Sequence, residues 1–176
     1  MQEKSLDTDN LDFTLYDPFL DDFSHLDFRD IDNSDPFKVD KFIHNNPKKY
    51  IDNHVSTIFT VRYHNQIIAF FTISMSSIGI KDIELDDKIN NIPFHSYPAL
   101  LLGQIGVDKK YRGHGIGQYI CKYCRGLGQQ VNENVACAFL ILQTTKGLAE
   151  QYYESKCDFK WKKSNKERVW MYRKLF

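Results

Sequence analysis

The sequence predicts a mixed α/β fold in which helices flank a single sheet. Residues 99–107 are almost entirely apolar, as expected of a strand buried on both faces. A Gly-rich stretch follows at 112–117, and apolar residues then recur at helical spacing over 116–131. Residues 56–63 and 67–76 are rich in β-branched and aromatic residues and are separated by three residues, which indicates a hairpin.

The N-terminal part predicts a short strand and two helices. Residues 11–16 alternate in hydropathy, which is typical of a strand. Asp17-Pro18 and Asp35-Pro36 each match a helix start, with Asp as N-cap and Pro in the first turn. The helices are expected over 17–28 and from 36 to about 47.

The C-terminal part predicts the remaining elements. Residues 79–98 form a polar loop, and 136–143 form another buried strand. Residues 146–156 form a helix, and 159–163 and 168–176 form a final hairpin. The expected sheet is therefore mixed and mostly antiparallel.

Length and composition favour one globular domain. The chain of 176 residues is long enough for one core, and we expect residues 11–176 to form a single domain after a disordered or frayed segment at 1–10. No apolar run reaches the length needed to cross a membrane, so no membrane partner is expected. The acidic start does not resemble a secretory signal, which makes the cytoplasm the expected location.

Charge is divided unevenly along a chain of zero net charge. Residues 1–40 hold twelve acidic against three basic side chains, and the remainder holds eleven against twenty. The C-terminal part therefore carries the cation surplus, which favours an anionic ligand and leaves nucleic acid as a less favoured partner.

The four cysteines do not predict a metal site. Cys121 and Cys124 form a C-x-x-C within the expected helix, whereas Cys137 and Cys157 are scattered. Zinc sites usually combine two close pairs, so we expect buried free thiols and no bound metal.

The Gly-rich turn carries the strongest functional signal. Glycines let a ligand approach the main chain, and the helix behind them begins with unpaired N–H groups and a positive dipole end. A strand, Gly turn and helix start therefore predict an anion site suited to phosphate, to which Arg112 adds a cation. This stretch is not a Walker loop, because no Lys-Ser/Thr follows its glycines. It is not a dinucleotide fingerprint either, because that motif requires Gly-x-Gly-x-x-Gly and the order here is Gly113-x-Gly115-x-Gly117.

The turn instead matches Arg/Gln-x-x-Gly-x-Gly/Ala and resembles the pyrophosphate motif of the GNAT superfamily of acyl-CoA N-acyltransferases. The match extends through Ile105-Gly106-Val107-Asp108 and to Ala149-Glu150-Gln151-Tyr152-Tyr153-Glu154, and it covers roughly residues 59–176. Part of the sequence, including residues 40–77, also looks like the toxin-type branch that acetylates aminoacyl-tRNA. The resemblance implies a GNAT-like sheet that splays at the strand before the turn, with acetyl-CoA as co-substrate.

The resemblance also implies roles for individual residues. The main chain of Ile105, Gly106 and Val107 would pair with the pantetheine arm. The pyrophosphate would lie against the turn, whose residues are Arg112, Gly113, His114, Gly115, Ile116, Gly117 and Gln118. His114 occupies a variable position of the motif and is expected to be a loop residue near phosphate.

Tyr153 matches the tyrosine that protonates the departing thiolate in the family, with Tyr152 as the alternative. A phenol keeps its proton at neutral pH and can donate it. Two departures put the register of this pair in question. The common Asn before the helix is absent, and the segment up to Phe159 is one residue longer than the family pattern and lacks its Gly.

The sequence leaves the general base and the acceptor open. His95, Asp82 and Glu84 are candidate bases in the loop 79–98. The acidic cluster there favours a cationic acceptor, so we expect an N-acetyltransferase acting on a primary amine of a small molecule or protein by direct attack in a ternary complex. The alternatives are a toxin-type enzyme acting on aminoacyl-tRNA and a non-catalytic acyl-CoA-binding module. Either a monomer or a homodimer fits the sequence.

Overall fold

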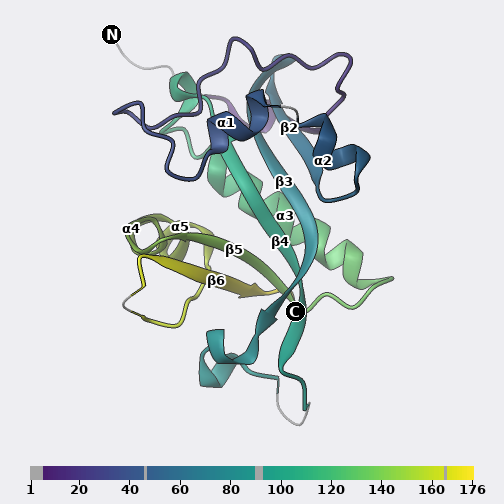
Figure 1. Cartoon of the computed structure of the whole chain (residues 1–176), viewed down its shortest axis with the longest axis vertical. Helices are drawn as coiled ribbons and strands as arrows, with labels where there is room; N and C mark the ends of the chain where they lie inside the picture. The colour runs from purple at the N-terminus through teal and green to yellow at the C-terminus, as the bar shows by residue number, and fades with distance from the viewer. Residues whose placement is uncertain (1–5, 46, 90–92, 165) are drawn as a thin grey trace. The chain divides into compact units, whose positions relative to one another are not determined.

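The computed structural model describes residues 6–45, 47–89, 93–164 and 166–176 (Figure 1). The chain divides into two compact units, which are described separately below. The first contains the residues up to Ile73 together with Gln104–Tyr119, and the second contains Ser74–Gly103 together with Ile120–Phe176. The expected disorder at 1–5 lies outside the described residues. Residues Thr8–Asn10 form a 3-10 turn, with Thr8 Oγ1 2.7 Å from the Tyr119 hydroxyl oxygen.

Six strands form one sheet in the order β1-β2-β3-β4-β5-β6. The strands are β1 (Leu11–Leu15), β2 (Thr57–Tyr63), β3 (Gln66–Gly79), β4 (Ser96–Val107), β5 (Phe139–Thr145) and β6 (Arg168–Lys174). The pairs β1–β2, β2–β3 and β5–β6 are antiparallel, whereas β4 pairs with β5 in parallel from Ala99 to Leu101. The prediction of a mixed, mostly antiparallel sheet flanked by helices is confirmed.

In the first unit, two short helices, α1 (Val39–His44) and α2 (Lys48–Asp52), accompany β1–β3 (Figure 1). Their apolar core joins the loop 17–38 to the sheet through Phe23, Phe28, Ile43, Ile58 and Phe70, all buried. The rings of Phe28 and Phe70 meet edge to face at 4.9 Å.

The helix predicted over 17–28 is wrong, because that segment is an irregular loop. Asp17, Asp22 and Asp27 each accept a hydrogen bond from the N–H two residues further on, at 2.8, 2.8 and 3.0 Å. Such side-chain bonds compete with helical bonding and favour turns. The second predicted helix starts later than expected, at Val39, whose N–H donates to Asp35 Oδ1 at 2.7 Å.

In the second unit, the sheet packs around Tyr97, Phe139, Ile141 and Tyr172, all buried. The helix α3 (Ile116–Asn132) contributes residues to both units, and its Gly128 leaves room for Leu175, which a Cβ would approach to 2.8 Å. The predicted C-terminal hairpin forms in part: its second strand is β6, whereas the first arm, in the described residues, makes only the isolated antiparallel bridge Lys160–Tyr172. Lys162, Lys163 and Lys166 are exposed in that segment, which favours a solvated loop over a paired strand.

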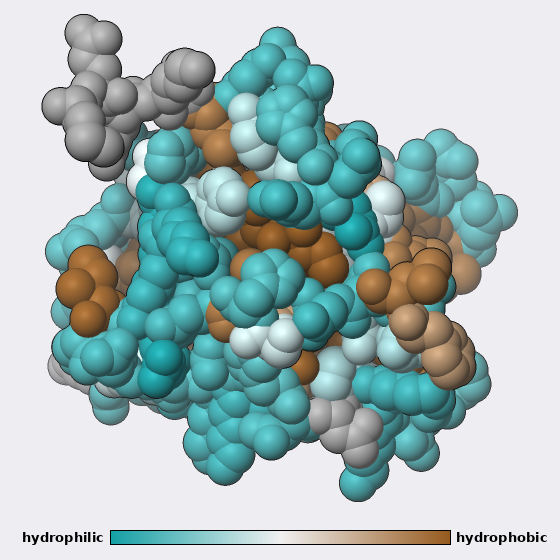
Figure 2. Space-filling model, turned by 90° about the horizontal axis from the view of Figure 1, so that it is seen from above, coloured by the Kyte–Doolittle hydropathy of each residue, from teal (hydrophilic) through white to brown (hydrophobic). Residues whose placement is uncertain are grey.

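The surface offers no extended apolar face in the view of Figure 2, where hydrophilic side chains surround separate small apolar patches. None of the helices in the described ranges is both long enough and apolar enough to cross a membrane.

Candidate functional site

The end of β4 in the first unit is shaped by a glycine under two aromatic rings. Gly106 is buried, and a Cβ at this position would lie 2.5 Å from Phe70 Cε1 and 2.9 Å from Phe28 Cδ1. Ile105 and Val107 on either side are half-buried. Gly106 therefore allows the aromatic core to pack directly on the main chain that was predicted to meet the pantetheine arm.

Asp108 turns the chain from β4 into the Gly-rich loop. Its buried carboxylate accepts the main-chain N–H of Lys110 at 2.9 Å and that of Asp27 at 2.8 Å. Its own N–H donates to Ile68 O at 2.9 Å, which holds the strand end on β3. What the sequence indicated as a polar break is thus a cap that fixes the direction of the turn.

The turn presents an open run of main-chain N–H groups. Gly113 and Gly115 adopt φ values of 83° and 77°, which L side chains rarely adopt. A Cβ on Gly113 would meet no atom within 4 Å, and one on Gly115 would meet only Gln118 Nε2 at 3.8 Å. Among the described residues, no group accepts a hydrogen bond from the N–H groups of residues 113–117. Successive free donors at the start of a helix suit an anion, so the turn remains the predicted phosphate site.

His114 and Gln118 frame the turn without blocking it. His114 Nδ1 lies 3.2 Å from Tyr111 O and 3.0 Å from Arg112 O, so the ring is held against the carbonyl side of the turn. The N–H of Gln118 donates to Gly115 O at 2.9 Å and closes the first helical turn of α3. This placement of His114 agrees with its interpretation as a loop residue.

Arg112 is a structural tie more than a free cation. Its Nε donates to Val107 O at 3.0 Å and its Nη2 donates to Phe28 O at 2.7 Å, while Nη1 lies 3.7 Å from Asp30 Oδ1. The guanidinium therefore joins the end of β4 to the N-terminal loop. The sequence could not show this, because Phe28 and Arg112 lie far apart in the chain.

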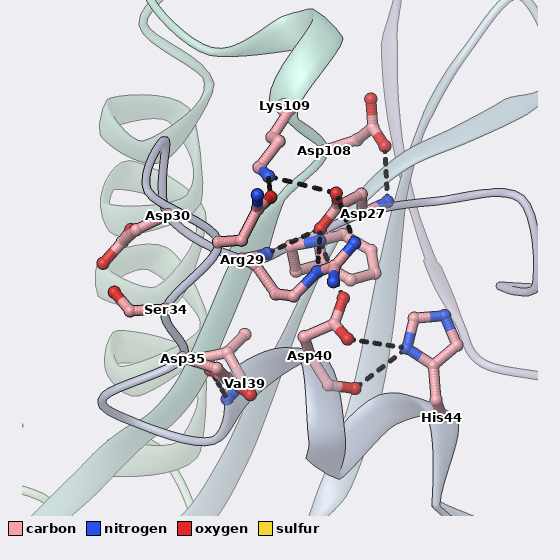
Figure 3. Close-up of polar contacts among 12 residues, drawn as sticks. Asp27, Arg29, Asp30, Ser34, Asp35, Val39, Asp40, His44, Asp108 and Lys109 are labelled. Carbon is pink, nitrogen blue, oxygen red and sulfur yellow. Dashed lines mark hydrogen bonds and ion pairs between the residues drawn. The ribbon is translucent and has the colours of Figure 1, made fainter.

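A second set of polar contacts holds the same loop (Figure 3). Asp27 accepts from Arg29 Nε and Nη2, both at 2.9 Å, and its Oδ2 lies 3.1 Å from Lys109 Nζ. The hydrogen bonds from Arg29, followed by that from Lys109, hold the pKa of the Asp27 carboxyl well below its usual range. Lys109 Nζ also donates to Asn33 Oδ1 at 2.8 Å. The residues leading into the Gly turn are thereby fixed to the loop 27–33.

We expect Arg112→Met to lower the free energy of unfolding by about 2–3 kcal/mol, because two carbonyls lose a charged donor at once. Urea denaturation without ligand measures this loss. Arg29→Met is the matched control, since its exposed ion pair with Asp27 should contribute much less. Equal stability of the Arg112→Met variant and the unmodified chain would contradict the tie.

The helix predicted to carry the catalytic tyrosine lies in the second unit. It consists of α4 (Lys146–Leu148), a π-helical turn (Ala149–Tyr153) and α5 (Glu154–Cys157). A π-helical turn holds one residue more than an α-helical turn, and this one includes both Tyr152 and Tyr153. The helix ends at Asp158, whose φ of 53° is the left-handed conformation that the family's missing Gly would adopt.

Tyr152 and Tyr153 are both half-buried, with their rings edge to face at 5.2 Å. The Tyr153 ring also meets Phe159 edge to face at 6.0 Å. Burial, and then the nearby Cys121 thiol, raise the pKa of Tyr153 well above its ordinary value. The raised pKa means that the hydroxyl keeps its proton. No group in the described ranges forms a hydrogen bond with this hydroxyl.

The four cysteines are free and buried, as predicted. Burial raises the pKa of the Cys124 thiol, which keeps it protonated and unreactive. Across the described ranges, His, Cys, Asp and Glu side chains form no group of three or more that could hold a metal ion.

The acidic loop 79–98 is not a uniform acidic surface. Asp87 is buried, accepts from Lys160 Nζ at 2.9 and 3.0 Å, and accepts from the Tyr172 hydroxyl at 3.0 Å. Tyr172 also accepts the N–H of Glu84 at 3.0 Å. One of the four acids is therefore a buried ion-pair partner, and the candidate base His95 is exposed.

Sequence reasoning missed a basic pocket in the second unit. Its cavity of about 330 Å³ is lined by cationic side chains from the 3-10 turn Ile80–Asp82, from β6 and from the loop before β6, with Asp82 as the acidic residue. The cations are Lys81, Lys162, Lys163, Lys166 and Arg168. The density of Lys and Arg over residues 160–168 was the signal that could have indicated it.

The strand β4, the Gly turn, the helix α3 and the sheet order match a GNAT-like fold, which confirms the predicted resemblance at the level of the fold. No protein-family model matches the chain, and no curated protein matches its sequence. The solved structures that it resembles include a tyrosine-to-phenylalanine mutant of KacT, with a TM-score of 0.78, 15% identity, and coverage of 94% of this chain and 95% of that one. AtaT complexed with acetyl-methionyl-tRNAfMet gives a TM-score of 0.75 at 15% identity, covering 91% of this chain and 93% of that one. AtaTR bound with AcCoA gives 0.72 at 16% identity, covering 95% of both chains.

Proposed function

We propose that the chain is an acetyl-CoA-dependent N-acetyltransferase that moves an acetyl group to a primary amine by direct attack in a ternary complex. The run of five free N–H groups at residues 113–117 carries the proposal, because it suits a pyrophosphate and serves no bond within the described protein. A similar fold in AtaTR is bound with AcCoA, which supports the choice of ligand.

The residues present fit acetyl-CoA. The main chain of Ile105–Val107 and the turn Arg112–Gln118 would hold it. The Arg112 side chain would fix the start of the turn through its bonds to Val107 O and Phe28 O and would not bind phosphate itself. When bound, acetyl-CoA supplies the activated acetyl thioester. Tyr153 holds a phenolic proton that it can donate to a departing thiolate, since burial raises its pKa.

For the acceptor amine, we favour aminoacyl-tRNA over the small-molecule or protein amine preferred from the sequence. Three observations support this choice. Asp87 is occupied by Lys160, which weakens the acidic cluster, and Asp82 borders a pocket with five cations. AtaT, a similar fold, is complexed with acetyl-methionyl-tRNAfMet.

An acceptor screen tests both levels of the proposal. Thiol release from acetyl-CoA is followed with charged tRNA, polyamines, amino acids and peptides. We expect turnover with charged tRNA above the rate without acceptor. Transfer to a polyamine or peptide alone would retain the N-acetyltransferase and reject the tRNA acceptor, and no transfer to any amine would favour a non-catalytic acyl-CoA-binding module.

Removing acids from the loop 79–98 should change the acceptor KM in opposite directions for charged tRNA and for a cationic amine. We expect the triple variant Asp82→Asn, Glu84→Gln and Asp86→Asn to lower the KM for charged tRNA, because removing acids reduces repulsion of a polyanion. A cationic acceptor would show a raised KM instead. Asp87 is left intact because its loss would leave the Lys160 contact unpaired. The KM for acetyl-CoA is the internal control.

A further inference from the structure

We propose that the basic pocket of the second unit binds the phosphates and one base of a single-stranded RNA end. This inference rests on the proposed function and adds the surface that would hold the acceptor. The pocket is defined by Lys81, Lys162, Lys163, Lys166, Arg168 and Trp170. It is separate from the Gly turn, which belongs to the first unit.

The charges of the pocket indicate an anionic ligand. Five cations face one carboxylate, that of Asp82. Lys81 and Lys166 have no side-chain partner among the described residues, and Lys162 Nζ donates only to the main-chain oxygen of Lys81, at 3.1 Å. Lys163 forms an ion pair with Glu154 at 3.1 Å. Lys81, Lys162 and Lys166 have no carboxylate partner among the described residues, and like charges gathered in one cavity repel each other and oppose folding, so ion pairs within the described chain do not account for these three. Phosphate groups would neutralise them.

The shape and the aromatic side chain favour RNA over a simple anion or an acidic peptide. A cavity of about 330 Å³ is at the lower end of ligand-site volumes and is far larger than one phosphate requires. Trp170 on β6 is 37% exposed and offers a ring on which an unpaired base can stack. The exposed amide of Gln143 on β5 adds a donor and acceptor for a base edge. An acidic peptide would use the charges but gain little from the ring.

The wall of the pocket is connected to the helix that carries the candidate acid. Lys163 Nζ donates to Glu154 Oε2 at 3.1 Å, and Trp161 Nε1 donates to the same oxygen at 3.3 Å. Lys163 also lies 4.2 Å from the centre of the Trp161 ring. Glu154 directly follows Tyr153, so these bonds hold the pocket loop on the Tyr153 helix within one unit. RNA in the pocket would therefore be bound next to the helix that we propose for catalysis.

The test uses the full chain with a fluorescently labelled tRNA in anisotropy titrations at several salt concentrations. We expect the triple variant Lys81→Gln, Lys166→Gln and Arg168→Gln to bind tRNA more weakly and to lower the slope of log affinity against log salt by about 3, or roughly one per lost phosphate contact. We expect Trp170→Ala to weaken binding by about ten- to a hundredfold, whereas Trp170→Phe retains most of it.

The matched control is the triple variant Lys41→Gln, Lys49→Gln and Arg125→Gln, which removes the same charge from exposed positions outside the pocket. We expect it to leave the salt slope nearly unchanged, and acetyl-CoA affinity to stay constant in all variants. Pocket variants that bind tRNA and acetylate charged tRNA like the unmodified chain would overturn the pocket while leaving the proposed function intact. Displacement of tRNA by polyglutamate, with no effect of Trp170→Ala, would also overturn it and indicate an acidic protein partner.

Discussion

Gly115→Asp should abolish acetyl-CoA binding and leave a folded protein. At φ of 77°, a side chain strains the turn by about 1–2 kcal/mol. The new carboxylate would also lie beside the N–H groups of residues 113–117 and repel a pyrophosphate. We expect acetyl-CoA affinity to fall by about a hundredfold or more, measured by calorimetric titration.

Gly126→Asp is the matched control for this variant. Gly126 is exposed in α3, and a Cβ there would meet no atom within 4 Å, so the same side chain is added without strain against a neighbour. Its affinity for acetyl-CoA should stay within a few-fold of the unmodified chain. Circular dichroism of both variants checks the fold. Normal acetyl-CoA affinity in a folded Gly115→Asp variant would refute the site.

Tyr153→Phe should lower kcat by about ten- to a thousandfold, the usual scale of general acid–base effects. The ring that meets Tyr152 and Phe159 remains, and the hydroxyl has no partner among the described residues. Stability and acetyl-CoA affinity should therefore change little. Steady-state kinetics with saturating acetyl-CoA measures the loss.

Tyr152→Phe is the control for the register of the tyrosine pair. It removes a hydroxyl from a ring that is also half-buried and should leave kcat close to that of the unmodified enzyme. The reverse result would assign the acid to Tyr152, and loss in neither variant would place the acid elsewhere.

The raised pKa of Tyr153 also predicts how kcat depends on pH. Burial favours the neutral phenol, so ionisation moves to higher pH than the ordinary value near 10. The acid therefore stays protonated below about pH 10, and kcat should show no decline from its ionisation in that range. A fall in kcat near neutral pH that the Tyr153→Phe variant lacks would contradict this assignment.

The fold class and the glycine turn could be predicted from sequence because their causes are local. Buried strands are apolar, hairpins have short connections, and positive φ values require Gly at positions 113 and 115. The wrong prediction of a helix over 17–28 also has a local cause. Asp17, Asp22 and Asp27 bond main-chain N–H groups two residues on, a competing turn signal that the Asp-Pro start concealed.

Contacts between distant segments could not be predicted in this way. Lys160 pairs with Asp87 across a separation of 73 residues, so one acid of the acidic run became the buried partner of an ion pair. Lys81 likewise joins Lys166 and Arg168 in one pocket although their segments are far apart in the chain. Charge counts along a sequence do not show which charges become neighbours.

The mixed sheet and the Gly turn with its free N–H groups follow from local sequence, because backbone propensity and hydropathy act over a few residues. The hydrogen bonds by which Arg112 joins β4 to Phe28, and the basic pocket of the second unit, follow from the folded structure. Both depend on which side chains folding brings together, since hydrogen bonds and charge interactions act over a few ångströms in space and not over distance along the chain.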